Sequence, residues 1–178
     1  MTRLLVSLVL FSSASFSVSA WAEQSVLELL SDEQNLSPQA LMLKVEKEYS
    51  GVICDFEIDV ENGELIYEVG VIDTERETLT EFEFKAKDGG LINQKVERLE
   101  AADKYGLKAV ILIEEMEQTF YSLVDKAMED RNGHIVGAKI DHDLGISYLE
   151  IKLIDAMGKR KLAFDIKSQR PLPLLTWD

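Results

Sequence analysis

The feature that most constrains this chain is an internal repeat. When the sequence is shifted by 82 positions without a gap, identical or similar residues align over about fifty positions. The identities are Leu41 with Leu123, Lys44 with Lys126, Gly51 with Gly133, Ile53 with Ile135, Ile58-Asp59 with Ile140-Asp141, Gly63 with Gly145, Glu68 with Glu150, Asp73 with Asp155, Phe82 with Phe164 and Lys85 with Lys167. We therefore expect two copies of one unit, residues 37–97 and 115–173, joined by a connector at 98–114.

Each copy is predicted to begin with a helix. Ser37-Pro38 is a helix start signal, because serine accepts from free backbone N–H groups and proline suits the first helical position. An apolar stripe at helical spacing follows in each copy, and a Gly-containing stop ends it at Ser50-Gly51 and Asn132-Gly133. The stripes are Leu41, Met42, Val45 and Tyr49 in the first copy, and Phe120, Leu123, Val124 and Ala127 in the second.

After each helix the apolar period changes to 2, which indicates half-buried strands. In the first copy Cys54, Phe56, Ile58 and Val60 alternate with acidic residues. Asn62-Gly63 predicts a tight hairpin turn, with Leu144-Gly145 at the matching place. Two more strands follow, the third with Thr80, Phe82 and Phe84 facing inward, and Leu91 to Val96 are a candidate fourth strand. In the second copy this region contains Pro171 and Pro173, which suit an edge strand or a tail. The expected fold is α+β, with two repeated units, each a helix packed on an antiparallel meander of three to four strands.

The first 22 residues have the pattern of a secretory signal peptide. A short positive start containing Arg3 precedes the apolar run Leu4 to Phe11, and Ala20-Trp21-Ala22 resembles a cleavage site. We expect cleavage after Ala22 and a periplasmic or secreted protein without a stable membrane anchor. No cysteine stands at the cleavage point, so a lipoprotein anchor is not indicated. Residues 23–36 are expected to form an arm or short helix, and 174–178 a C-terminal tail.

Composition excludes several function classes. The chain of 178 residues has 19 basic and 33 acidic side chains, a net charge of −14, which disfavours binding to nucleic acid. Removing residues 1–22 leaves 156 residues with a charge of −15. One cysteine rules out an internal disulfide, and two histidines offer little material for a soft-metal site or an imidazole-based active site.

The residues that carry reactive chemistry each have a structural interpretation that we favour. Cys54 lies on the apolar side of its predicted strand, and Val136 occupies the matching position, so a buried structural cysteine is expected. In Asp141-His142-Asp143, strand alternation sends the histidine to the face opposite the aspartates. His134 matches Val52 and is expected to pack as a strand residue. We assign no catalytic, cofactor-binding or metal-ligating residue and expect no cofactor.

Carboxylates are concentrated on the outward positions of the first unit. They comprise Glu57, Asp59, Glu61, Glu64, Glu68, Glu81 and Glu83. A weak Ca²⁺ site or an acid/base pair is geometrically conceivable there, but no EF-hand loop or other catalytic or phosphate-binding motif is present. We expect a solvated acidic sheet face.

The run Ala109 to Ile113 in the connector is compatible with either a strand or the first turns of a long second helix. Five consecutive apolar residues are expected to pack against one unit or between the two. The two units should therefore form one rigid body.

Two segments of the first copy resemble the PepSY family. The resemblance lies in the run Asp59 to Val69, where Asn62-Gly63 precedes Tyr67-Glu68-Val69, and in Phe82 to Ile92 with its Asp88-Gly89-Gly90 turn. The second copy departs from it, since Leu149 replaces the tyrosine and Arg170-Pro171 replaces the Asp-Gly turn. The resemblance implies a helix followed by an antiparallel sheet, no catalytic residues, and a role in binding or restraining proteases or other exported proteins.

Two function classes follow. The leading one is a non-enzymatic extracytoplasmic protein whose partner is another exported protein, with proteases among the candidates. It would dock that partner by adding a strand to a sheet edge or by offering its acidic face. The alternative is a periplasmic sensor that binds a small ligand or a cation.

Overall fold

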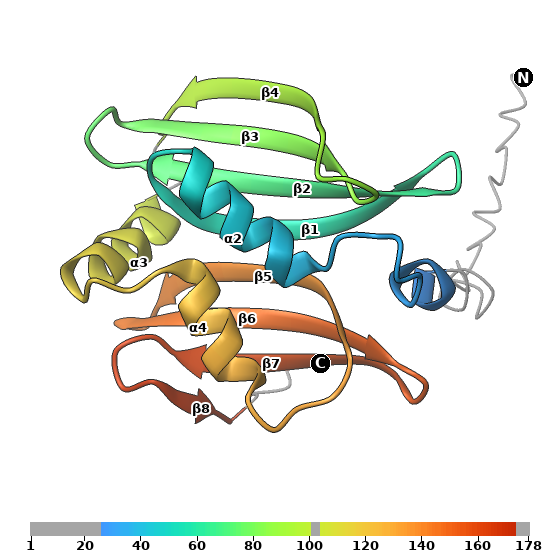
Figure 1. The fold of residues 1–178 in the computed structure, drawn as a ribbon. Coiled ribbons are helices and arrows are strands. Elements are labelled where there is room, and N and C mark those ends of the chain that lie inside the picture. Colours follow the sequence, from blue (N-terminus) through green and yellow to red (C-terminus); the bar gives the residue numbers. More distant parts are fainter. Residues whose placement is uncertain (1–25, 101–103, 174–178) are drawn as a thin grey trace, which may run out of the picture.

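One antiparallel sheet of eight strands forms the body of the molecule in a computed structural model, which describes residues 26–100 and 104–173 (Figure 1). The strand order is β4-β3-β2-β1-β5-β6-β7-β8. The strands are β1 (Val52–Glu61), β2 (Glu64–Asp73), β3 (Thr78–Lys85), β4 (Leu91–Arg98), β5 (His134–Asp143), β6 (Ile146–Asp155), β7 (Gly158–Asp165) and β8 (Arg170–Leu172). The predicted signal peptide and C-terminal tail lie outside the described residues.

Three longer helices pack on this sheet, so the fold is α+β. They are α2 (Pro38–Glu48), α3 (Lys104–Glu115) and α4 (Phe120–Met128), preceded by a short helix at 26–30. Figure 1 shows α2 and α4 lying over the same face of the sheet, while α3 lies at one end of it. The run 109–113 is therefore helical, and its Ala109, Val110 and Ile113 are fully buried.

The helix and hairpin signals are confirmed at their predicted positions. Ser37 accepts a hydrogen bond from the Ala40 N–H at 3.2 Å, and Pro38 begins α2. At the two predicted hairpins, Asn62 and Leu144 have φ of 53° and 49°, and the glycine after each is also positive. The proline-containing segment forms the short edge strand β8, and the opposite edge is the eight-residue strand β4.

The two halves of the sheet join through strands β1 and β5. The ladder between β1 and β5 has three residue pairs, with Phe56 opposite Ala138, Asp55 opposite Lys139 and Glu57 opposite Gly137. Phe56 and Ala138 are themselves 82 positions apart, so the pairing is symmetric about this point. We call these three pairs the seam. A single sheet continuous across both halves was not part of the expectation.

The position of Cys54 differs from the prediction because β1 contains a register shift. β1 shifts register between Ile53 and Asp55, and β5 does so between Ile135 and Gly137. Each shift marks a bulge with one extra residue, Cys54 in β1 and Val136 in β5. Cys54 is buried, as expected, but as the extra residue of the bulge it does not follow the alternation of side chains between the two faces of β1. Its Sγ lies 3.2 Å from the point where a Cβ on Gly70 would stand, on the sheet face opposite α2 and α4.

The third strands correct the ungapped alignment. Phe84 lies opposite Tyr67, whereas Phe164 lies opposite Leu149. The equivalent positions in β3 and β7 are thus 80 apart rather than 82, because the turn between β6 and β7 is two residues shorter. Phe164 therefore corresponds to Phe84 and not to Phe82.

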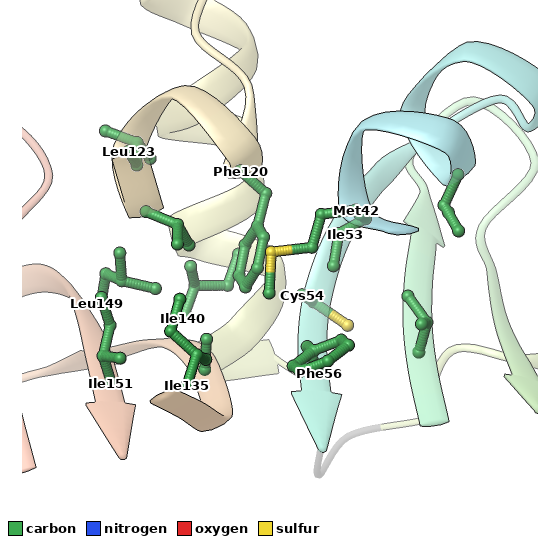
Figure 2. Close-up of a cluster of buried hydrophobic side chains, with 14 of the residues drawn as sticks. Met42, Ile53, Cys54, Phe56, Phe120, Leu123, Ile135, Ile140, Leu149 and Ile151 are labelled. Atoms are coloured by element: carbon green, nitrogen blue, oxygen red, sulfur yellow. The ribbon is translucent and has the colours of Figure 1, made fainter. Parts of the chain in front are cut away.

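The core is continuous across both halves. Figure 2 shows Met42 of α2, with Ile53 of β1 beside it, and Phe120 of α4 above Phe56 of β1 and Ile140 of β5. Both helical side chains are fully buried, and α2 contacts α4 directly.

Glu46 of α2 caps the first turn of α4. Its carboxylate accepts the Tyr121 N–H at 2.8 Å and so satisfies a helix-end donor. Burial raises the pKa of Glu46, while hydrogen bonds from Tyr121, Thr119 and Phe120 act in the opposite direction.

We expect Glu46→Ala to lower the free energy of unfolding by about 1–2 kcal/mol, because it leaves this donor unsatisfied. Urea denaturation followed by circular dichroism measures the change. The exposed neighbour Glu48 is the matched control, and its alanine variant should change stability by less than about 0.5 kcal/mol. Equal losses in the two variants would contradict the capping role.

Candidate binding face

The sheet face opposite α2 and α4 carries a row of three directly opposed glutamates. The register places Glu57 of β1 opposite Glu68 of β2, and Glu68 opposite Glu83 of β3. Glu57 and Glu68 are exposed. We call this set the glutamate row. Like charges directly opposite each other on neighbouring strands destabilise a sheet.

The electrostatics of Glu68 reflect this crowding. Burial raises the pKa of its carboxyl, and the charges of Asp59, Glu83, Glu57 and Glu61 raise it further. Asp55, in the next row, also has a raised pKa, first from burial and then from Glu57, while Lys139 and Lys152 act in the opposite direction. Part of the negative charge on this face is therefore held at a cost to folding.

The charge along this row of opposed residues changes from negative to positive across the seam. Beyond Glu57 the row continues through Gly137 to Lys152 and Lys161. Lys152 Nζ reaches over β5 to Glu57 Oε1 at 2.6 Å. A Cβ on Gly137 would lie 3.1 Å from Lys152 Cδ, so glycine at this position leaves room for the lysine to cross.

Two hollows lie on either side of this ion pair. The first, of about 400 Å³, is lined by Cys54 and Gly70 and flanked by carboxylates of Asp55, Glu57 and Glu68. We call it the acidic hollow. Gly70 has no side chain, and a Cβ there would lie only 3.2 Å from Cys54 Sγ, so the thiol packs against the glycine.

The second hollow, of about 570 Å³, lies mainly over β5, β6 and β7. Its walls are largely apolar, and its cations are Lys152, Lys159, Arg160 and Lys161. We call it the basic hollow. Val136 lines it, as Cys54 lines the acidic hollow, so each bulge residue contributes to one hollow.

The histidines and their neighbours do not form a shared site. His142 Nδ1 lies 2.9 Å from Ser147 Oγ, whereas Asp141 and Asp143 act on Tyr148, whose pKa is raised by burial first and by these charges next. His134 is half-buried at the start of β5, opposite Ile154. Within residues 26–100 and 104–173, no three His, Cys, Asp or Glu side chains are placed to hold one metal ion.

The glutamate row was partly visible in the sequence and its basic continuation was not. Alternation predicts an acidic face on β1 and β2, but only the pairing of β1 with β5 places Lys152 beside Glu57. One signal was present in the aligned copies. Asp55 aligns with Gly137 and Gly70 with Lys152, so the glycine of each opposed pair changes strand between the copies.

Stability should rise as the pH falls from neutrality toward about 4.5. Glu46, Asp55 and Glu68 have raised pKa values, so the folded protein binds these protons more tightly than the unfolded chain does. Ionisation of these three carboxyls destabilises the fold at pH values above the folded pKa, and this effect disappears below their ordinary pKa values of 4.5 for Glu and 3.8 for Asp.

Asp73 acts in the opposite direction at lower pH. Hydrogen bonds from the Arg76 backbone and side chain lower its pKa below 3.8, so its stabilisation is lost as the pH falls further. Urea midpoints measured across this range should therefore pass through a maximum. A midpoint that falls steadily from neutrality would contradict the assignment.

Comparison with known proteins shows neither a family nor a function. No family model matches the chain, and no curated protein matches it. Among solved structures, the chain is similar to a "putative lipoprotein" from Clostridium difficile 630, with 16% identity and a TM-score of 0.45, covering 82% of this chain and 95% of that one. Among the described residues, no helix is both long and apolar enough to cross a bilayer.

Proposed function

We propose that this chain is a non-enzymatic extracytoplasmic binding protein that docks another exported protein on its open sheet face. The observation that carries the proposal is the glutamate row, in which three carboxylates oppose one another on adjacent strands. An arrangement that weakens folding is expected where it serves a function, and a cationic partner would relieve the repulsion.

The proposal includes two PepSY-like units at 37–97 and 115–173, joined by residues 98–114. Three observations support it. The seam pairs Phe56 with Ala138 at the repeat offset, both copies have a bulge at matching positions, and both have a positive-φ hairpin turn. The PepSY resemblance, with its protease-restraining members, makes an exported protease one candidate partner.

The partner's contact surface is expected to be rich in Lys and Arg. The lining of the acidic hollow combines an excess of carboxylates over its one cation, Lys139, with Gly70 and Ile72, which suits the charged end and aliphatic stem of a basic side chain. The net charge of −14 would accelerate encounter with a positive surface. The signal-like segment at residues 1–22 supports export, which brings the chain to such partners.

Capture from periplasmic extract tests the proposal. The immobilised chain should retain a protein partner at low salt and release it as ionic strength rises, because exposed charge pairs are screened. Glu68→Lys should abolish capture. Glu75→Lys, which makes the same charge change at an exposed turn residue, should preserve it. Failure to recover a partner at low and moderate salt, or equal capture by both variants, would contradict the proposal.

A further inference from the structure

The basic hollow stands apart from the acidic surface around it. In a chain with a net charge of −14, four basic residues and one acidic residue, Glu57, line one hollow. The side chains of Lys152, Lys159 and Lys161 share one sheet face, whereas Arg160 lies opposite the buried Leu153 and donates to Asn132 O. Exposed ion pairs join Lys152 to Glu57 and Lys161 to Glu150. Such exposed ion pairs contribute little to stability, so these cations can turn toward another anion at small cost.

The walls between these cations are apolar. The apolar residues of the lining are Val26, Ile58 and Val136, together with Leu153 and Ile154, which are both only 1% exposed. Ile58 and Val136 are only half-buried, so they leave apolar surface within the hollow. The hollow opens beside the seam, where the pairing of β1 with β5 ends at Glu57. Its volume of about 570 Å³ lies in the usual range for small-molecule sites.

We propose that the basic hollow binds a single-chain amphiphile with an anionic head, of the fatty-acid type. The apolar walls would hold the hydrocarbon tail, and the amino groups of Lys159 and Lys161 would hold the carboxylate. This site is separate from the glutamate row and does not depend on the protein partner.

Charge complementarity favours a free amphiphile over a membrane surface. Electrostatic interactions in solution are screened over about 8 Å at physiological ionic strength, so a small ligand in the hollow responds mainly to the nearby cations. An extended anionic bilayer would also meet the glutamate row on the same face and would be repelled.

Thermal shift and calorimetry with sodium dodecanoate, below its micelle concentration, test the site on the chain beginning at Glu23. A ligand that binds the folded state raises the melting temperature, by several degrees at about 100 times its Kd. Dodecanol, which lacks the charge, and acetate, which lacks the tail, should bind at least about tenfold more weakly. Sedimentation with vesicles containing phosphatidylglycerol should recover no protein.

Two variants locate the site. Val136→Asp places a carboxylate within the apolar wall and should abolish dodecanoate binding. Lys161→Gln should weaken binding about three- to tenfold. The matched control is Lys95→Gln on β4, because Lys95 and Lys161 are both 58% exposed and both ion-paired. The control should leave binding unchanged.

Several outcomes would overturn the proposal. These are no shift with dodecanoate, equal affinity for dodecanol, unchanged binding by folded Val136→Asp and Lys161→Gln, or binding to vesicles without binding to free dodecanoate. Since partner capture depends on Glu68, either proposal can fail while the other holds.

Discussion

Replacing Phe120 by alanine is expected to lower the free energy of unfolding by about 3–5 kcal/mol. Phe120 is fully buried at the start of α4 and belongs to one hydrophobic cluster that includes Met42 of α2 and Phe56 of β1. The side chain therefore packs where the two halves of the fold meet (Figure 2). Its loss would leave a cavity that the helices on either side can fill only in part.

Urea denaturation followed by circular dichroism measures this loss. The exposed fraction of Tyr121 is larger, so Tyr121→Ala serves as the neighbouring control and should cost less. Because the core spans both halves, we expect one transition in the wild type and in the variant. Two separate transitions, or a loss below about 1 kcal/mol, would contradict a shared core.

Local elements could be predicted from the sequence because their signals are local. Ser37-Pro38 specifies its helix start by capping, and Asn62-Gly63 specifies its turn by a positive-φ requirement. The acidic outer positions of β1 could likewise be predicted by alternation, since each depends only on its neighbours in the chain.

The arrangement of the halves depends on long-range pairing. Three residue pairs join β1 to β5, and nothing local in either strand specifies its partner. The bulge at Cys54 could not be predicted either, because the alternation of apolar and acidic residues gives no sign of one extra residue that shifts the register. The third-strand correspondence failed for a similar reason, since a turn shortened by two residues is invisible to an ungapped offset.

The carboxylates of the candidate face could be predicted from the sequence, but the lysines that lie beside them could not. The Lys152–Glu57 contact requires that β5 pairs with β1, which depends on the whole fold. It also requires a glycine at position 137. Consequently, the sequence predicts one acidic surface, whereas in the structure an ion pair joins the glutamate row to the lysines of the basic hollow.

Replacing Glu68 by glutamine is expected to affect stability and binding in opposite directions. The change removes the middle charge of the glutamate row, so repulsion from Glu57 and Glu83 is relieved. Stability should rise by up to about 1 kcal/mol. Binding to a cationic partner should weaken by about tenfold, since the same charge attracts the partner.

Glu75→Gln is the matched control for this variant. Glu75 is exposed in the turn after β2, outside the row, so neutralising it changes the net charge equally without relieving the row. We expect little change in stability and at most a small reduction in capture. A similar gain in stability for both variants would attribute the effect to net charge alone.

The most direct test of the account measures the urea midpoint and partner capture on the same preparations of wild type, Glu68→Gln and Glu75→Gln. A functional glutamate row predicts that Glu68→Gln alone is more stable and captures less partner. If Glu68→Gln is more stable but captures the partner as well as the wild type does, the glutamate row is not the binding surface.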